Sequence, residues 1–293
     1  MLVGNARAGK EARNGIALAR DELVRSGEVE VVDLAEPATL DEVLDRLGGR
    51  TLVVGGGDGT VHSIVQRLWD RHQLDAVTIG LLPLGTGNDF ARCLQIPITP
   101  VGAAATIRFG RPVVLDLLVD DRGAVVVNAA HAGVSSGASV RAAWLKPYLG
   151  RAAYPVATTL AGALADGVAM RVDVDEQTIH EGPVLLLAVM NGTGIGGGAP
   201  VAPEADPRDG QADVIVVPDE GRLRRVAIAR ALRAGRLAEV EGVSLRRGRD
   251  IVVTGVPARH NVDGEVGEPV TERRYVVVPG AWRVITAPAA PTG

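Results

Sequence analysis

The chain has 293 residues, of which 46% are apolar and 23% charged, and its formal net charge is −4. This composition is that of a globular protein, the length suggests about two domains of roughly 150 residues, and the negative charge argues against nucleic acid as a partner. The single Cys93 excludes an intramolecular disulfide framework, and no apolar run approaches the ~20 residues needed to span a bilayer. We therefore expect a cytoplasmic protein without a transmembrane segment.

The first 115 residues alternate short apolar runs with amphipathic helical stretches. Strands are predicted at 2–3, 29–32, 51–54 and 77–82, and helices over 11–26, 40–47, 61–69 and 90–94. Strands that alternate with helices imply an α/β domain with a parallel sheet. Only three residues precede Gly4, so either the first strand is short or the natural start lies upstream of Met1.

After Pro112 the pattern changes to strands punctuated by turn signals such as Asp209-Gly210 and Asp263-Gly264. Strands are predicted at 113–119, 124–130, 170–174, 184–190, 212–217, 251–254 and 275–278, and helices over 154–166 and 223–240. We expect domain 1 at residues 1–115 and a β-sandwich domain at 116–286, whose last segment could return to domain 1. Residues 287–293, rich in Pro and Ala, form a flexible tail.

Two glycine-rich segments are interpreted as accidental motif matches. Gly4 to Lys10 fits the G-x4-G-K part of a P-loop, but Glu11 follows where a Ser or Thr would hold Mg²⁺. The segment 192–197 fits G-x-G-x-x-G and follows a strand, but prolines at 200 and 203 prevent the helix that a dinucleotide site needs.

The loop Gly55-Gly-Gly-Asp58-Gly-Thr60 lies between a predicted strand and a predicted helix. Consecutive glycines let the backbone approach a phosphate and point N–H groups at it, and the following helix N-terminus favours the negative charge. Asp58 would repel phosphate unless a metal ion or a proton mediates. The plain alternative for Asp58 is a turn or helix-capping residue.

A second loop, Pro83-Leu-Gly85-Thr86-Gly87-Asn88-Asp89-Phe90-Ala91-Arg92, also follows a strand and opens a helix. Both loops are expected at the same carboxyl edge of the sheet, where open α/β sheets bind ligands. The Thr86 hydroxyl can bind a phosphate, whereas Asn88 and Asp89 are also good helix-capping residues.

Together, GGGDGT and PLGTGNDFAR resemble the diacylglycerol kinase catalytic-domain family, in its bacterial lipid kinase branch. Three further blocks extend the resemblance over nearly the whole chain: Asn5 to Gly9, Asn191 to Gly210, and Asn261-Val-Asp263-Gly264-Glu265. The family implies an α/β nucleotide-binding domain and a β-sandwich with lipid-site residues, with the active site between them.

The resemblance also implies roles for particular residues. The expected ATP contacts are Asn5, Gly55, Gly56, Gly57, Asp58, Gly59, Thr60, Val61, Gly85, Thr86 and Asn88. Asp58 would hold Mg²⁺, and Glu265 would accept the proton of the substrate hydroxyl, with Asp263 as the alternative base or a metal helper. By itself, Asp-Gly is simply a hairpin turn.

A structural Mg²⁺ site is implied by the same resemblance, with the Val201 carbonyl, Glu204 and Asp206 as ligands. Oxygen ligands at short spacing suit this hard cation. Relatives more often have Asp at the position of Glu204, and the alternative is a solvated acidic loop.

The resemblance thus predicts an ATP-dependent lipid kinase that uses Mg²⁺ and acts on diacylglycerol or a related lipid. The arginine-rich segment 222–249 could contact anionic headgroups at the inner membrane face, or could be a solvated surface. The alternatives are a kinase of a soluble acceptor, in the manner of NAD kinase, and a non-catalytic nucleotide-binding regulator.

Overall fold

The computed structural model describes residues 1–4, 10–34, 37–133 and 166–288. Two compact units are distinguished: a first unit of residues 1–117, 196–198 and 278–293, and a second unit of residues 118–195 and 199–277. Asn5, most of the predicted helix 154–166 and most of the predicted tail lie outside the described residues.

The first unit contains a parallel sheet in the order β2–β1–β3–β4–β17. Its strands are β1 (Leu2–Gly4), β2 (Val31–Asp33), β3 (Leu52–Gly56), β4 (Thr78–Pro83) and the end of β17 (Val270–Thr286). The predicted first strand is present as β1, and it pairs with neighbours on both sides. The prediction of an α/β fold with a parallel sheet is therefore confirmed.

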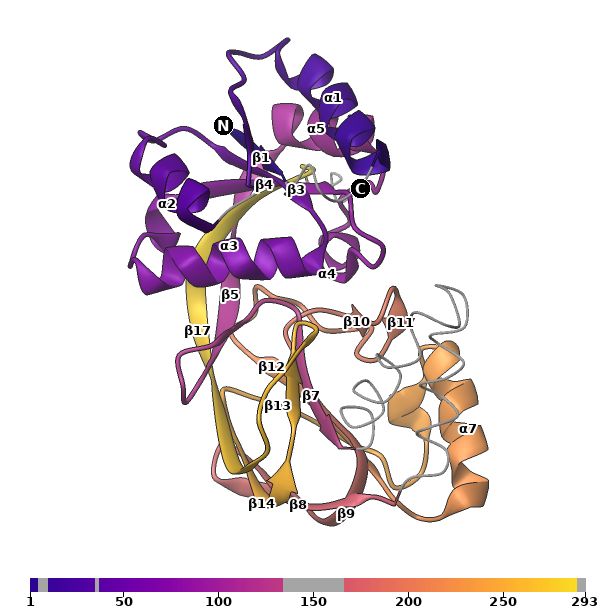
Figure 1. The fold of residues 1–293 in the computed structure, drawn as a ribbon. Coiled ribbons are helices and arrows are strands. Elements are labelled where there is room, and N and C mark those ends of the chain that lie inside the picture. The colour runs from indigo at the N-terminus through magenta and orange to yellow at the C-terminus, as the bar shows by residue number, and fades with distance from the viewer. Residues whose placement is uncertain (5–9, 35–36, 134–165, 289–293) are drawn as a thin grey trace. The chain divides into compact units, whose positions relative to one another are not determined.

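Helices cover both faces of this sheet: α1 (Lys10–Leu23) and α5 (Pro100–Phe109) on one face, α2 (Pro37–Asp45) and α3 (Asp58–Asp70) on the other (Figure 1). Connections between parallel strands are right-handed, so their direction decides the face on which each helix lies. The connection β1–α1–β2 runs toward one edge of the sheet, whereas β2–α2–β3 and β3–α3–β4 run toward the other, which places α1 on the opposite face from α2 and α3. Helix α5 and the short 3₁₀ turn at Leu74–Ala76 were not predicted. Short α4 (Asp89–Cys93) is buried through Phe90, which stacks on Trp282 of β17 with ring centroids 5.5 Å apart.

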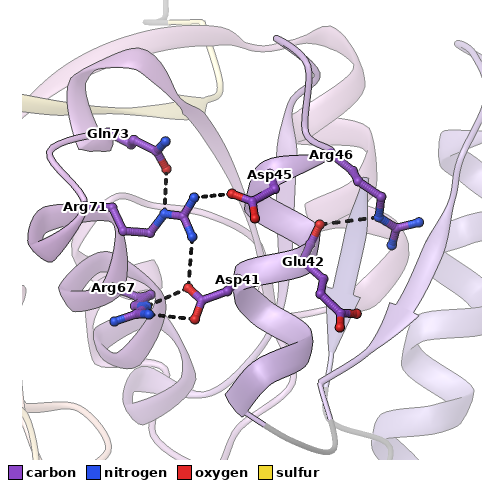
Figure 2. A network of polar contacts seen from close by, with 7 residues as sticks. All are labelled: Asp41, Glu42, Asp45, Arg46, Arg67, Arg71 and Gln73. Atoms are coloured by element: carbon purple, nitrogen blue, oxygen red, sulfur yellow. Dashed lines mark hydrogen bonds and ion pairs between the residues drawn. The ribbon is translucent and has the colours of Figure 1, made fainter.

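A network of charged side chains joins α2 to the end of α3 at the surface of the first unit (Figure 2). Arg67 donates two hydrogen bonds to the Asp41 carboxylate, and Arg71 contacts both Asp41 and Asp45. The hydrogen bond from Arg67, assisted by Arg71, lowers the pKa of Asp41 to about 2. These groups are partly or fully exposed to solvent, so the network fixes local geometry and contributes little to stability.

The second unit is built from antiparallel strands, with the path β16–β15–β7–β9–β8–β14–β17, with β12 beside β9 and β13 beside β12. The strands are the end of β5 (Arg111–Asp120), β6 (Val125–Val126), β7 (Ala129–Gly133), β8 (Val168–Val174), β9 (Gln177–Met190), β12 (Ala212–Pro218), β13 (Ser244–Gly248), β14 (Asp250–Ala258), β15 (His260–Val262) and β16 (Glu265–Val266). The predicted strand 124–130 is two strands, because the chain leaves the ladder at residues 127 and 128. Strands β13, β15 and β16 were not predicted.

Two apolar clusters stabilise the second unit. One lies between its strands and includes Leu118, Val189 and Tyr275. The other includes Met190 and Leu237 and is covered in part by α7 (Arg222–Arg233), whose Ile228 and Leu232 pack on it. The predicted helix 223–240 ends early, since Gly235 has φ +67° and a 3₁₀ turn at Leu237–Glu239 follows.

The segment after β9 folds into a small two-stranded sheet of β10 (Gly194–Ile195) and β11 (Ala199–Pro200). No helix opens after the G-x-G-x-x-G match, as the prolines predict. Among the described helices of the whole chain, none is long and apolar enough to cross a membrane.

Candidate active site

β1 and β3 are neighbours in the first unit's sheet, and the chain continues from them toward opposite edges: from β1 to β2, and from β3 to β4. Open α/β sheets bind ligands in the crevice outside such a switch point. Gly4 ends β1 beside Gly55 of β3. A Cβ built on Gly4 would lie 3.2 Å from the Gly55 carbonyl oxygen, and one on Gly55 would lie 3.3 Å from the Val3 oxygen. Both glycines are buried, and the side chain of Ile16 packs against them, so the close approach of β1 to β3 leaves no room for a larger residue at either position.

The first glycine loop runs from Gly55 into α3, with Gly57 as the N-cap. The Gly57 carbonyl accepts hydrogen bonds from the N–H groups of Thr60 and Val61, at 3.0 and 3.1 Å. Asp58 is the first residue of the helix, and its Oδ1 accepts a hydrogen bond from the Phe90 N–H at 3.2 Å. Asp58 is thus fixed by both glycine loops.

The second loop lies directly against the first, backbone to backbone. The Leu84 N–H donates to the Gly56 carbonyl at 2.9 Å. A Cβ on Gly85 would lie 2.3 Å from the Gly57 Cα, so no larger residue fits there without moving a loop. Asn88, in the left-handed region at φ +54°, closes the turn by binding both the N–H and the carbonyl of Gly85 at 2.9 Å. Thr86 remains exposed at the tip.

Asp89 is a functional candidate that sequence reasoning treated mainly as a helix cap. Its carboxylate accepts the Gly197 N–H, at 2.9 and 3.1 Å from its two oxygens, which holds the glycine segment 196–198 on the first unit. Burial raises the pKa of Asp89, and the neighbouring Asp58 carboxylate raises it further. No local pattern could have indicated this contact, because the two residues are far apart in the sequence.

A small pocket opens beneath these loops. Its lining residues are Gly56, Gly57, Asp58, Val61, Leu81, Leu82, Pro83, Asn88, Phe90 and Ala91. Of the expected ATP contacts, Gly56, Gly57, Asp58, Val61 and Asn88 line this pocket, whereas Gly55, Gly85 and Thr86 do not.

In the second unit, the Asp-Gly-Glu motif forms the hairpin between β15 and β16. Asp263 and Gly264 have φ +48° and +102°, as a two-residue type I′ turn requires, and Val262 pairs with Glu265 across it. The Asp263 carboxylate accepts three backbone hydrogen bonds, from Val127 at 2.7 Å and from Asn128 and Ala129 at 2.9 Å.

Glu265 is exposed, and among the described residues its carboxylate has no hydrogen bond or ion pair. Asn261, buried in the same hairpin, accepts the Gly264 N–H through its Oδ1 at 2.8 Å. The two carboxylates of the motif are therefore placed differently. That of Asp263 is bound by backbone N–H groups, whereas that of Glu265 is exposed to solvent.

Two histidines lie near this hairpin and are held neutral. His131 of β7 is directly opposite Asn261, and His260 contacts the Tyr275 hydroxyl through Nδ1 at 2.8 Å. Burial lowers the pKa of each to about 4; the Asp263 charge partly opposes this at His131, and Arg273 lowers the pKa of His260 further. Neither histidine lies in a metal-binding group of the described residues.

The loop of the expected structural metal site offers a different arrangement of its acidic groups. The Asp206 carboxylate is engaged by Arg208 through two hydrogen bonds of 2.6 and 2.9 Å. Burial and the nearby Glu204 raise the pKa of Asp213 to about 6. No group of three or more acidic, His or Cys residues that could hold a metal is found in the described chain. The ligand set Val201, Glu204 and Asp206 stays a prediction, and the Arg208 contact does not favour it.

Asp58 fits the other expected cation better. A Cβ on Gly87 would lie 3.0 Å from the Asp58 Oδ2 and 3.5 Å from the Asp89 Oδ2, so two carboxylates face one glycine. Mg²⁺ in kinases is commonly held by one or two carboxylates together with substrate phosphates. Asp58 and Asp89 supply two such carboxylates beside Gly87 of the second glycine loop.

Comparisons with known proteins cover both units. The family model described as the diacylglycerol kinase catalytic domain matches residues 1–119, and the model of the YegS C-terminal NAD kinase beta sandwich-like domain matches residues 128–286. The second match confirms the predicted β-sandwich.

Curated relatives are named "probable lipid kinase YegS-like". The protein from Xanthomonas axonopodis pv. citri is 33% identical over 248 residues, which is 81% of this chain and 79% of the relative. The protein from Pseudomonas aeruginosa is 33% identical over 242 residues, which is 81% of this chain and 76% of the relative.

Solved structures share the fold at lower identity. A diacylglycerol kinase from Bacillus anthracis has a TM-score of 0.77 at 21% identity, covering 98% of this chain and 96% of that chain. An NAD kinase from Archaeoglobus fulgidus in complex with ATP has a TM-score of 0.55 at 13% identity, covering 97% and 92%.

Proposed function

Since the chain belongs to the diacylglycerol kinase catalytic-domain family, among the YegS-like lipid kinases, we propose that it transfers the γ-phosphate of ATP to a hydroxyl of diacylglycerol or a related lipid. The observation that carries this proposal is the pair of glycine loops after β3 and β4, which touch at Gly57 and Gly85 and hold the Asp58 carboxylate through the Phe90 N–H. The family membership confirms the resemblance predicted from those loops.

The reaction divides between residues of the two units. The substrate hydroxyl oxygen attacks the γ-phosphorus, the bond from that phosphorus to the bridging oxygen breaks, and ADP leaves with the electron pair. The hydroxyl proton passes to a carboxylate of the Asp-Gly-Glu motif, for which exposed Glu265 is the proposed base. A positioned base of this kind contributes about 10²–10⁴-fold to the rate.

Phosphate binding is assigned to the first unit. The backbone of Gly55 to Val61, together with Gly85 and Thr86, is proposed to bind the ATP phosphates, and Asn88 to keep the second loop in shape. Asp58 is proposed to hold Mg²⁺, which supplies charge neutralisation at the phosphate oxygens when bound.

The test is transfer of labelled γ-phosphate from ATP with Mg²⁺ to a mixed-micelle panel of diacylglycerol, monoacylglycerol, ceramide, sphingosine and undecaprenol. We expect one labelled lipid class with the wild type, and at least a hundredfold loss with Asp58→Asn and with Glu265→Gln. Asp70→Asn, at the other end of α3, and Glu268→Gln, an exposed carboxylate just after the motif, are the matched controls and should retain activity. ATP turnover without any labelled lipid would favour a soluble acceptor instead.

Peripheral contact with anionic lipid is a separate proposal for the arginine-rich segment. Several of its arginines are already paired with carboxylates: Arg225 with Asp219, and Arg236 with Glu239. Arg230 and Arg233 of α7 are exposed and have no ion pair among the described residues. Each such charge near an anionic surface contributes about 1 kcal/mol. Arg230→Ala/Arg233→Ala should weaken co-sedimentation with anionic vesicles, and equal binding to neutral vesicles would contradict the proposal.

A further inference from the structure

We propose that Asp263 is a positioning residue, whose carboxylate anchors the turn that presents Glu265 and does not itself accept the substrate proton. The inference rests on the proposed kinase reaction and deepens it. It separates the two carboxylates of the Asp-Gly-Glu motif, which the sequence leaves as alternatives for one role.

The anchor is a set of three consecutive backbone N–H groups. Those of Val127, Asn128 and Ala129 converge on the two Asp263 oxygens at 2.7–2.9 Å, and the Asp263 N–H donates back to the Ala129 carbonyl at 3.0 Å. Successive N–H groups that point into one concavity bind an anion, and such charge-assisted bonds are stronger than neutral ones. Both oxygens of the Asp263 carboxylate are engaged by backbone donors, so this carboxylate is turned into the backbone and is not presented to a substrate hydroxyl.

Two of these N–H groups, those of Val127 and Asn128, lie where the chain leaves the sheet ladder between β6 and β7, and the third belongs to Ala129, the first residue of β7. The same interruption is tied to the segment that follows β9. Asn191 donates its side-chain N–H to the Val127 carbonyl at 2.8 Å, and Asn128 donates to the Gly194 carbonyl at 2.9 Å. The anchor therefore sets the hairpin in register with residues 191–194 of the second unit.

Glu265 depends on this anchor for its placement. Its own carboxylate has no partner among the described residues, and its strand β16 has only two residues. What fixes it is the type I′ turn, held by Asp263 on one side and by Asn261 on the other. A displacement of about 1 Å at a reacting group can cost about 10²-fold in rate, so loss of the anchor should lower turnover although the base is still present.

The chain contains a matched turn that provides the control. Asp175 and Glu176 join β8 to β9, with φ of +48° and +66°. The Asp175 Oδ1 accepts the N–H groups of Arg249 and Asp250, both at 2.9 Å. This turn has the same two-residue length, the same left-handed first residue and the same type of carboxylate anchor, but it lies outside the motif.

The experiment compares Asp263→Asn, Asp175→Asn and Glu265→Gln in the full chain, measuring lipid phosphorylation, its pH profile and thermal stability. Asn tolerates the left-handed region as well as Asp does, so the first two substitutions remove only the carboxylate. We expect similar falls in Tm for both, a tenfold to hundredfold lower kcat with unchanged KM for ATP for Asp263→Asn alone, and wild-type kcat for Asp175→Asn. Asp263→Gly, which keeps the turn without the anchor, is the second variant if Asp263→Asn does not fold.

The pH profile separates positioning from proton transfer. A base that must be ionised gives a fall in activity toward low pH; Asp263→Asn should retain this limb at its reduced rate, whereas Glu265→Gln should lose it. Faster amide exchange at residues 127–129 in Asp263→Asn is the structural readout. A wild-type kcat in Asp263→Asn, or loss of the low-pH limb in that variant, would overturn the inference. Failure of the proposed function is a different result, namely absence of phosphorylated lipid with the wild type.

Discussion

The two units hold their site residues in place by different means. In the first unit, two loops touch through bare backbone at Gly57 and Gly85, where a Cβ would come within 2.3 Å of a neighbouring Cα. In the second unit, the hairpin at Asp263 is held by hydrogen bonds between a carboxylate and three amides. One site is shaped by the absence of side chains, the other by a charged side chain and its partners.

This difference predicts different sensitivities. A contact between two backbone segments does not change when side chains are protonated, but it leaves no room for added side-chain atoms. A polar arrangement that includes buried histidines tolerates volume better and responds to pH. Three experiments test this contrast.

The largest expected effect is acid destabilisation of the second unit through His260. This side chain is 4% exposed, and burial, with Arg273, lowers its pKa to about 4 from the usual 6.5. Between these two values the unfolded chain binds a proton that the folded chain does not, so stability is complete above pH 6.5 and falls as the pH drops toward 4. The loss amounts to about 3 kcal/mol at most, at 1.36 kcal/mol per pKa unit.

Native-state amide exchange from pH 7 to 4.5, resolved by unit, measures this effect. His260→Gln can keep a hydrogen bond to Tyr275 and removes the titration, so its second unit should lose less stability on acidification than that of the wild type. An equal loss of stability in the wild type and in His260→Gln, or in both units of the wild type, would contradict the predicted difference between the units.

Next in size is Gly85→Ala in the first unit. The new methyl group would overlap the Gly57 backbone, which we expect to destabilise the unit by about 1–3 kcal/mol and to weaken ATP binding at least tenfold. Gly27→Ala, where nothing lies within 4 Å of the added Cβ, is the control. Chemical denaturation at pH 5 and pH 7 should show the same cost at both values, since no proton is involved, and calorimetry measures ATP binding.

The smallest effect is expected at the surface network of Figure 2. Asp41→Asn removes the acceptor shared by Arg67 and Arg71, but all three side chains are at least partly exposed to solvent. Denaturation midpoint and kinase activity should stay within experimental error of the wild type. A clear loss of stability would show that polar contacts also stabilise the first unit. It would then contradict the proposed difference, in which only the second unit depends on such contacts.

The sequence predicts much of the fold of the first unit because its signals are local. Strand–glycine–helix succession at Gly55 and at Gly85 identifies both loops and their shared sheet edge. Helix α5 was missed because its apolar residues, Val101 to Ile107, show little periodicity, although Thr99 caps it and Pro100 opens it. A reading that gave the Thr-Pro pair more importance could have found this helix.

The polar contacts of the site could not be predicted in the same way. The Asp263 carboxylate meets amides 134–136 positions earlier in the chain, and Asp89 meets Gly197 108 positions later. Such contacts depend on the tertiary fold, and an Asp-Gly pair in a sequence indicates only a turn. The separate orientations of Asp263 and Glu265 therefore emerge from the structure.

The first unit is discontinuous in the sequence, which matters for anyone who would express it alone. Its sheet is completed on one side by Arg283 and Val284, which pair with β4, and its buried Phe90 is stacked on Trp282. A fragment that stops near residue 119, where the first family model ends, would leave β4 as an open edge, and such edges recruit strands from other copies. We expect that fragment to aggregate. A circular permutant that carries residues 278–288 ahead of Met1 is the better starting point for a minimal nucleotide-binding module.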